Sequence, residues 1–356
     1  MTIDLILDCQ FGSTGKGLFA SYLAERHAPD VIAYAPSPNA GHTFYHNGQE
    51  VIHKMLPSGV TSPDLRTIVL GPGSLLDLDR LYREITRLGD CGIPCPAILI
   101  HENAAIVQDR HREAESKGEG APGSTRQGTG EAQAERILRK KDGDPILAKD
   151  MTLQDSVRII GTAEMQQVYY RAKRLQVESA QGYSLSIYHG DYPHVTCRDV
   201  TTASILSDTG VPIMRQMNVY GTFRTYPIRV ANRDGRSSGP CYDDSKEVSF
   251  ASLGLKQELT TVTKLPRRIF TWSQQQAIEA CNQNRVNSAF LNFAQYPPTF
   301  AELRHIWHSL SEGTNVQYLG FGPTASDVYR VGDPSIDFAR VEKLWRRYRT
   351  AAGLDC

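Results

Sequence analysis

The sequence has no excess of charge of either sign. Lys and Arg together number 39 of the 356 residues, and Asp and Glu also number 39. Proteins that bind nucleic acids or membrane surfaces through a broad basic face carry a surplus of Lys and Arg. We therefore expect no nucleic-acid partner and no membrane partner, while a local basic pocket remains compatible with the composition.

Cysteine is scarce and scattered, which argues against a disulfide framework or a zinc site. The number is odd, no CxxC pair occurs, and the seven cysteines stand at positions 9, 91, 95, 197, 241, 281 and 356. Such cysteines are typical of reduced thiols inside the cell. No apolar run reaches the roughly 18 residues of a membrane span, and "MTIDLILD" is too short and too acidic for a signal peptide. We expect an enzyme-sized protein in the cytoplasm.

Short apolar runs alternate with helical patterns along most of the chain. The runs lie at 3–8, 31–35, 67–71, 97–101, 175–180, 287–293 and 315–321. They show little polar alternation, as expected of strands that are buried on both faces of a parallel sheet. This indicates an α/β fold with a large central, mainly parallel sheet flanked by helices. The length would allow two domains, but no linker separates them, so we expect one domain over residues 1–356.

The segment "GSTGKG" follows the first predicted strand and precedes a helical pattern. A strand, a glycine turn and a helix together aim free backbone N–H groups and the positive end of a helix dipole at one point. Lys16 can add its charge there. The segment is neither a Walker A loop, since Gln10 stands at the required first glycine, nor GxGxxG. It predicts a phosphate site, with an ordinary strand-to-helix turn as the alternative if it stood alone.

Four further polar loops follow other predicted strands or precede helices. "PNAGHTF" at 38–44 places a histidine beside a glycine, "GSTRQGTG" at 123–130 is a second glycine-hydroxyl loop, and "SAQGYS" at 179–184 sets Gln181 beside a glycine. The segment 258–270 combines hydroxyls with basic residues, a mixture suited to a small carboxylate. A flexible linker is the alternative for the second loop, and a solvated basic turn for the last.

In this order the segments resemble the adenylosuccinate synthetase family. The matching stretches are "CQFGSTGKGL", "NAGHT", "HKMLPSG", "GSTRQGTG", "ESAQGYSLSIYHGDYPHVT", "TTVTKLPRR" and "GFGP". The resemblance extends to about residue 325. It implies an α/β domain, usually dimeric, that moves a γ-phosphoryl group to O6 of a purine monophosphate and then displaces it with the amine of L-aspartate.

The resemblance also implies site residues, taken position by position. Catalysis is expected of Ser13, Lys16, His42 and Gln181, and the Mg²⁺ cofactor is expected at Ser13 and Gly41. Binding of the nucleoside triphosphate is expected of Gly12, Ser13, Thr14, Gly15, Lys16, Gly17, Gly41, His42, Thr43, Asn292, Gly320, Gly322 and Pro323. Binding of the monophosphate is expected of Ser13, Asn39, Ser124, Thr125, Arg139, Gln181, Thr196 and Leu265. L-Aspartate is expected at Thr263 and Arg267, and Arg139 is expected to reach the neighbouring active site of a homodimer.

Three departures from the family pattern narrow the substrates. Ser13 replaces the family's aspartate, which acts as general base and metal ligand, and a hydroxyl cannot act as that base at neutral pH. The bacteriophage branch of the family has serine there and uses dGMP, whose 2-amino group needs space. Ala294 replaces the carboxylate that reads guanine in GTP, which predicts ATP or dATP as donor. Leu265 stands where the family has an arginine at the ribose 2′-hydroxyl, which suits a deoxyribose.

The sequence therefore predicts a ligase that joins L-aspartate to dGMP with ATP or dATP. Its product is the 2-amino-2′-deoxy analogue of adenylosuccinate, a precursor of diaminopurine DNA. Two alternatives remain open at this point. One is an ordinary adenylosuccinate synthetase that uses IMP, and the other is a nucleotide sensor without ligase activity.

Overall fold

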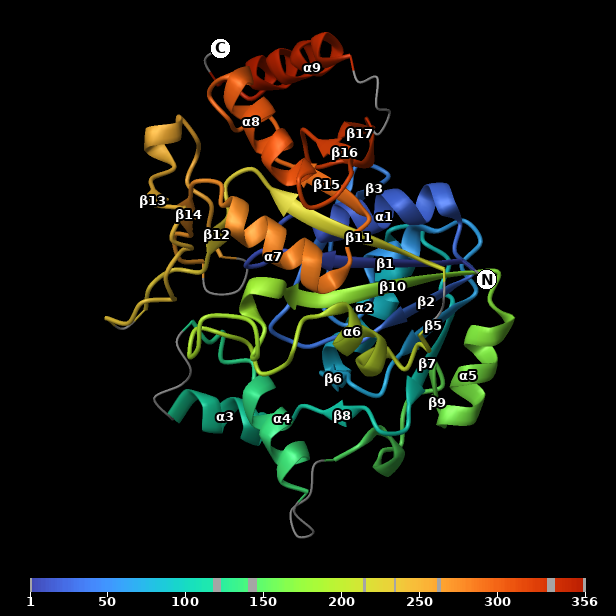
Figure 1. The fold of residues 1–356 in the computed structure, drawn as a ribbon. Helices are drawn as coiled ribbons and strands as arrows, with labels where there is room; N and C mark the ends of the chain where they lie inside the picture. The colour runs from blue at the N-terminus through green and yellow to red at the C-terminus, as the bar shows by residue number, and fades with distance from the viewer. Residues whose placement is uncertain are drawn as a thin grey trace.

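The centre of the computed structural model is a ten-stranded sheet (Figure 1). The structure describes residues 2–117, 123–139, 146–213, 216–233, 235–260, 264–331 and 337–354. The strands, in spatial order, are β17 (Val328–Arg330), β16 (Val316–Gly320), β15 (Ser288–Asn292), β11 (Met217–Arg224), β1 (Thr2–Asp8), β10 (Arg174–Gly182), β2 (Val31–Tyr34), β5 (Thr67–Leu70), β7 (Ala97–His101) and β9 (Val157–Ile160).

Neighbouring strands of this sheet are parallel except for β16 and β17, which pair antiparallel. The predicted α/β fold with a mainly parallel central sheet is therefore confirmed. Parallel strands bring their carboxyl ends to the same edge, where α/β proteins bind ligands. In Figure 1 the arrows of β10 and β11 point toward a small sheet made of β12 (Ile228–Arg229), β14 (Arg268–Phe270) and β13 (Glu247–Val248).

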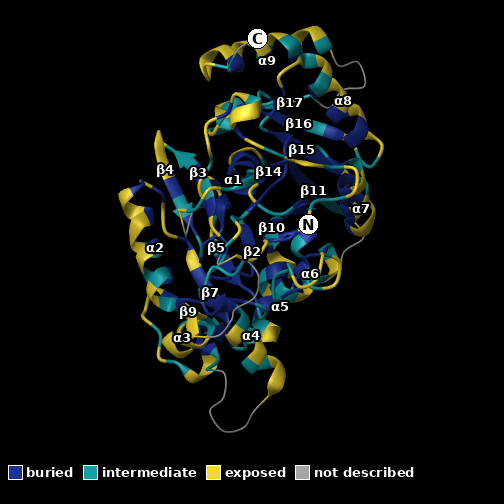
Figure 2. Ribbon diagram, turned by 90° about the vertical axis from the view of Figure 1, so that its left-hand side faces the viewer, coloured by how far each residue is buried: buried dark blue, intermediate teal, exposed yellow. Residues whose placement is uncertain are grey.

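Helices cover both faces of the sheet. The helices are α1 (Lys16–His27), α2 (Leu78–Asp90), α3 (Asp109–Lys117), α4 (Thr129–Leu138), α5 (Thr162–Arg171), α6 (Thr202–Thr209), α7 (Gln274–Asn284), α8 (Phe300–Ser311) and α9 (Phe338–Ala351). Side chains of α5 to α9 share one apolar cluster with alternate residues of β1. Helix α1 packs against the opposite face of the sheet, and α2 packs with β2, β5 and β7. The strands are dark blue in Figure 2 because they are buried.

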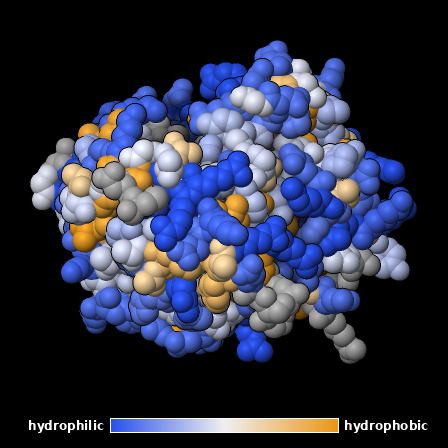
Figure 3. Space-filling model, turned by 90° about the horizontal axis from the view of Figure 1, so that it is seen from above, coloured by the Kyte–Doolittle hydropathy of each residue, from blue (hydrophilic) through white to orange (hydrophobic). Residues whose placement is uncertain are grey.

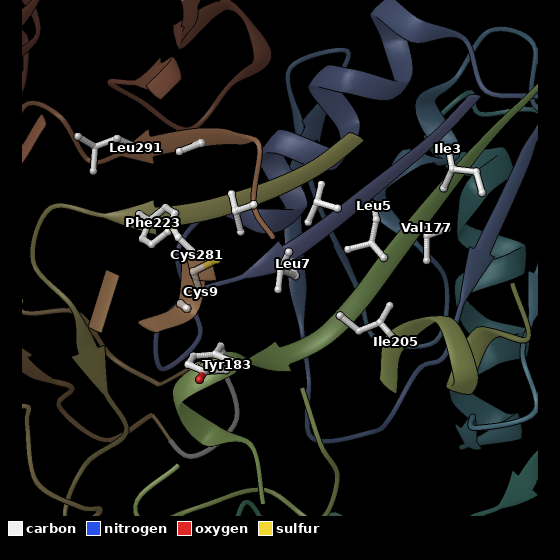
Figure 4. Packing of buried hydrophobic residues seen from close by; sticks show 14 of the residues in the cluster. Ile3, Leu5, Leu7, Cys9, Val177, Tyr183, Ile205, Phe223, Cys281 and Leu291 are labelled. Atoms are coloured by element: carbon white, nitrogen blue, oxygen red, sulfur yellow. The ribbon is translucent and has the colours of Figure 1, made fainter. Parts of the chain in front are cut away.

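Alternate residues of β1 explain why its sequence lacks polar alternation. Leu5 and Leu7 point into the cluster shown in Figure 4, where they lie near Val177 and Ile205. Ile6 points the other way and packs against Phe19 of α1 and its neighbours. A strand covered on both faces has no side that favours polar residues.

Two smaller elements complete the arrangement. The hairpin of β3 (His42–His46) and β4 (Gln49–His53) follows β2, and the short strands β6 (Leu75–Leu76) and β8 (Ala105–Ile106) lie beside α4. The surface on the α9 side is mainly hydrophilic, with small apolar groups between charged side chains (Figure 3). No helix in the described part of the chain is long and apolar enough to cross a membrane.

The sequence interpretation missed β11, although this strand lies directly beside β1. Its sequence, "MNVYGTFR", has a glycine in the middle, which weakens the strand pattern. Packing requires that glycine, because a Cβ at Gly221 would lie 2.8 Å from the sulfur of Cys9. The strand was therefore missed because Gly221, which packing against Cys9 requires, interrupts the sequence pattern of a strand.

Candidate active site

The loops that follow β1, β2, β10 and β15 meet in one cavity of about 460 Å³ at the carboxyl edge of the sheet. The loop before α4 and the segment before β14 complete its wall. The order of the strands in the sheet thus brings loops that are far apart in the sequence to the same cavity.

The buried carboxylate of Asp8, at the end of β1, organises the glycine loop. It accepts hydrogen bonds from the backbone N–H groups of Gln10 (2.9 Å), Gly12 (3.2 Å) and Thr14 (3.3 Å), and from the Thr14 hydroxyl (2.6 Å). These bonds fold the loop tightly around one carboxylate. They leave Ser13 exposed at the cavity wall with a left-handed backbone, φ 58°.

Asn292, at the end of β15, holds the same loop by a hydrogen bond. Its side-chain amide donates to the Thr14 carbonyl (3.2 Å) and its oxygen accepts from the backbone N–H of Phe293 (2.9 Å). A Cβ at Gly15 would lie 2.0 Å from this amide nitrogen, and Gly15 has φ 87°. Only glycine satisfies both conditions without strain.

Lys16 and His42 line the cavity as a hydrogen-bonded pair. The Lys16 Nζ lies 2.7 Å from His42 Nε2 and also donates to the Ser179 carbonyl. Burial lowers the pKa of Lys16 to about 8, although the nearby carboxylates act to raise it. Burial, together with the Lys16 charge, lowers the pKa of His42 well below its ordinary value. The imidazole is therefore neutral at pH 7, with Nε2 accepting from Lys16 and the proton on Nδ1.

Gln181 lies at the end of β10, two residues after Ser179, and also lines the cavity. Its amide donates to the Asn39 side-chain oxygen (2.9 Å), which also accepts from the Ser37 hydroxyl (2.7 Å). Gln181 has a left-handed backbone, φ 69°. The pair holds two amide side chains on the cavity wall, where they offer hydrogen-bond donors and acceptors.

In the loop before α4, a hydroxyl group and a backbone N–H group donate hydrogen bonds to the carboxylate of Glu115. The Glu115 carboxylate accepts from the Ser124 hydroxyl (2.7 Å) and from the backbone N–H of Gly128. Ser124, Thr125 and Glu115 all line the cavity. A hydroxyl and a free N–H at the start of a helix are suited to a phosphate as well as to a carboxylate.

The segment before β14 contributes Leu265 and Arg267 to the cavity. The Leu265 carbonyl accepts from the Thr260 backbone N–H (2.9 Å), and the Leu265 N–H donates to the Thr260 hydroxyl (3.0 Å). The Arg267 Nε donates to the Leu259 carbonyl (3.2 Å). Thr263, the other residue predicted to bind aspartate, lies outside the described residues.

Most of the predicted site residues line this one cavity. These are Gly12, Ser13, Gly15, Lys16, Gly17, Asn39, Gly41, His42, Thr43, Ser124, Thr125, Gln181, Thr196, Leu265 and Arg267. The remaining described candidates, which do not line it, are Thr14, Asn292, Gly320, Gly322, Pro323 and Arg139. Thr14 is fully buried and its hydroxyl bonds Asp8 and Thr222 (2.6 Å each), so it holds the loop in place.

Several cavity residues escaped the sequence interpretation. Phe11, Arg229, Glu258 and Phe293 line the wall. The buried Arg229 guanidinium lies 4.3 Å from the Phe11 ring and donates to three backbone carbonyls. Phe11 lies within the glycine loop and Glu258 begins the segment 258–270 singled out above, but no local pattern points to Arg229 or Phe293.

Ala294 is fully buried, and its N–H donates to the Gly320 carbonyl (2.9 Å). Its neighbour Phe293, not Ala294, faces the cavity, with φ 57°. The wall at this point is therefore aromatic and carries no carboxylate from these two residues.

Comparison with known proteins agrees with this geometry. A family model for adenylosuccinate synthetase matches residues 5–158 and 146–304. The N6-succino-2-amino-2′-deoxyadenylate synthase of Cyanophage S-2L is 50% identical over 97% of this chain and 96% of its own length. The enzyme of the same name from Acinetobacter phage SH-Ab 15497 is 41% identical over 98% of each chain.

A solved structure is also similar along almost the whole chain. It is the succinoaminodeoxyadenylate synthetase of Cyanophage S-2L bound to dGMP and to dATP as an energy donor. The TM-score is 0.92 with 49% identity, covering 98% of this chain and 99% of that one. With the fold, the family model and full-length relatives in agreement, the chain belongs to the adenylosuccinate synthetase family.

Proposed function

We propose that this ligase joins L-aspartate to C6 of dGMP and uses ATP or dATP as the phosphoryl donor. The observation that carries the proposal is Ser13, a small neutral side chain exposed on the cavity wall where the family has a carboxylate. The relatives that share nearly the full length are named for the corresponding product, and the similar solved structure holds dGMP and dATP.

The chemistry has two steps. The γ-phosphoryl group moves from the triphosphate to O6 of dGMP, and N1 loses its proton. The aspartate amine then attacks C6 and displaces phosphate, so the products are a nucleoside diphosphate, phosphate and N6-succino-2-amino-2′-deoxyadenylate. Most of the catalytic effect in such transfers comes from positioning and from stabilising charge.

The cavity residues suit these tasks. The glycine loop and Lys16 provide N–H groups and a positive charge for the triphosphate. The neutral His42 imidazole can donate a hydrogen bond to the transferred phosphoryl group. Gln181 is placed to hydrogen-bond the purine edge, and Asn39 and Thr125 to bind its 5′-phosphate. Arg267 offers a cation to a carboxylate of L-aspartate.

The donor set also fits Mg²⁺ as a partial shell. Ser13 and Gly41 are both exposed on the cavity wall and offer a hydroxyl and a carbonyl oxygen. No group of three or more His, Cys, Asp or Glu within the described residues could hold a metal on its own. Mg²⁺ commonly keeps waters and binds nucleotide phosphates with few protein ligands. When bound, it would neutralise charge on the triphosphate.

The proposal includes a homodimer. Arg139 does not line the cavity but is exposed at the end of α4, next to Ile137 and Leu138, which are 64% and 59% exposed. An exposed apolar pair beside an arginine is suited to a protein interface. Light scattering should show a dimer, and Arg139→Leu should lower activity with dGMP more than it lowers dimer content.

The decisive experiment mixes purified protein with Mg²⁺, L-aspartate, ATP or dATP, and either dGMP or IMP. Formation of the succino product with dGMP, followed by mass spectrometry, is the expected result. Turnover of IMP alone would refute the choice of monophosphate. Replacing ATP by GTP should lower kcat/KM, and equal use of GTP would refute the donor assignment. These substrates are cytoplasmic metabolites, so the proposal places the reaction in the cytoplasm.

A further inference from the structure

Arg224, at the carboxyl end of β11, has a fully buried side chain that contacts three separate loops. Its guanidinium donates to both Glu258 carboxylate oxygens (2.7 and 3.3 Å) and to the Ser13 carbonyl (3.3 Å). It also lies 4.0 Å from the Phe293 ring centre. A buried cation is costly unless it is paired, so these contacts are strongly favoured.

Glu258 lies between two guanidinium groups. It is held by Arg224 on one side and receives a hydrogen bond from the Tyr296 hydroxyl (3.2 Å). Burial is the largest single influence on the pKa of Glu258 and acts to raise it. The charges of Arg224 and Arg267, with the hydrogen bonds from Arg224 and Tyr296, together lower it below its ordinary value, so the carboxylate is ionised at neutral pH. Arg267 is the second guanidinium, and its charge acts on Glu258 in the same direction.

Arg267 is placed within reach of Glu258 but does not pair with it. The Arg267 N–H donates to the Glu258 carbonyl (2.9 Å), and Leu259 and Pro266 form an antiparallel bridge between them. Residues opposite each other in such pairing have Cβ atoms about 5 Å apart. In the described part of the chain no carboxylate forms an ion pair with Arg267.

The cluster of Arg224, Glu258 and Arg267 has a net charge of one positive unit. Arg224 and Arg267 carry two positive charges, and Glu258 carries one negative charge that Arg224 binds directly. The uncompensated charge is then on Arg267, which lines the cavity. Without Arg224, Glu258 would gain by turning to Arg267, its nearest remaining cation.

We propose that Arg224 is a positioning residue for the amino-acid site: it binds Glu258 and thereby keeps Arg267 free for a substrate carboxylate. The inference rests on the proposed function and deepens it, because it explains how a cavity that contains a carboxylate beside Arg267 still accepts an anionic amino acid. Arg224 acts through Glu258 and Arg267 and does not contact the substrate.

The test is a set of three variants, Arg224→Met, Glu258→Gln and the double variant, assayed for the KM of L-aspartate at saturating nucleotides. Arg224→Met should raise that KM about 10- to 100-fold, the value of a charge-assisted bond. Glu258→Gln should leave it equal or lower. The double variant should return to within about threefold of Glu258→Gln, since no carboxylate is left to compete.

Other results would overturn the proposal. If the double variant keeps the high KM of Arg224→Met, Arg224 acts through the Ser13 loop or through folding alone. An unchanged KM in Arg224→Met also refutes it. Arg174→Met is the matched control, because Arg174 pairs with the buried Asp4 carboxylate (2.8 Å) at the amino ends of β10 and β1, the edge of the sheet opposite the cavity. It should lower Tm without changing the aspartate KM.

Three precautions keep the test decisive. If Arg224→Met does not fold, Arg224→Lys replaces it, and a smaller rise in KM that Glu258→Gln again removes is expected. If the wild-type protein uses IMP and not dGMP, the proposed monophosphate fails, and the same variants are compared with IMP. If it turns over neither, calorimetry with L-aspartate and both nucleotides replaces the KM, and absence of aspartate binding to the wild type refutes both proposals.

Discussion

Ser13→Asp is the substitution that tests the proposed substrate most directly. Ser13 is exposed on the cavity wall, and its carbonyl, not its side chain, is held by Arg224. Its φ of 58° lies in the left-handed region, which aspartate tolerates better than most residues. The variant should therefore fold, and its effect should be confined to the ligand.

The expected loss of kcat/KM for dGMP follows from the space that the longer side chain occupies. Aspartate adds two heavy atoms to the wall where we place the 2-amino group of dGMP, and overpacking a fitted site costs about 1–3 kcal/mol. We expect kcat/KM for dGMP to fall roughly 5- to 150-fold. The same reasoning predicts a much smaller loss for dIMP, which lacks that amino group. Ser13→Ala, which keeps the space but removes one neutral hydrogen bond, should cost only about 0.5–1.5 kcal/mol.

The assay is phosphate release with dGMP and with dIMP for the wild type and both variants, with Tm as the control for folding. The ratio of kcat/KM for dGMP to that for dIMP should fall in Ser13→Asp and change little in Ser13→Ala. An unchanged or higher ratio in Ser13→Asp would show that residue 13 does not face the 2-amino group. The spatial argument would then be wrong, whatever the absolute rates.

Three further predictions concern the glycine loop. Gly15→Ala should weaken ATP binding and lower stability by about 1–3 kcal/mol, because its Cβ would meet the Asn292 amide at a left-handed φ; an unchanged Tm and KM for ATP would contradict this. Thr14→Val should lower the free energy of unfolding by about 1–3 kcal/mol in denaturant titrations, because buried Asp8 loses its 2.6 Å hydroxyl partner; no loss would show that the loop does not depend on that bond. Burial lowers the pKa of Lys16 to about 8, so above pH 8 the lysine of the free protein is largely neutral and must be protonated when the triphosphate binds. ATP affinity should therefore be level below pH 8 and fall up to tenfold per pH unit above it, and a level profile to pH 9.5 would refute the role of this charge.

Strands buried on both faces were predictable because their apolar runs are continuous. The seven runs read from the sequence all became strands of the central sheet, and the glycine loop begins where the first one ends. β11 was missed because Gly221, placed there by its contact with Cys9, interrupts the pattern. A residue chosen by tertiary packing leaves no periodic signal.

The candidate site divides in the same way. Residues in recognisable loops, such as Lys16, His42 and Gln181, could be named from local sequence and resemblance, and the structure brings them to one cavity. Arg224 and Glu258 could not, because their relation depends on a contact across 34 residues of chain. In the sequence alone, Arg224 ends a strand that was not predicted, and Glu258 is a charged residue of a kind usually found at the surface.

The positions that we propose to set specificity differ in how far they are buried. Ser13 is exposed and Leu265 only half-buried, and Ser13 has no side-chain bond on which the described loop depends, so the acceptor nucleotide can change without altering the scaffold. Ala294 is fully buried behind Phe293, and a carboxylate introduced there would be an unpaired buried charge. We therefore expect that restoring a preference for guanine in the donor requires the neighbours of Ala294 to change as well, whereas a substitution at residue 13 alone should alter the acceptor preference.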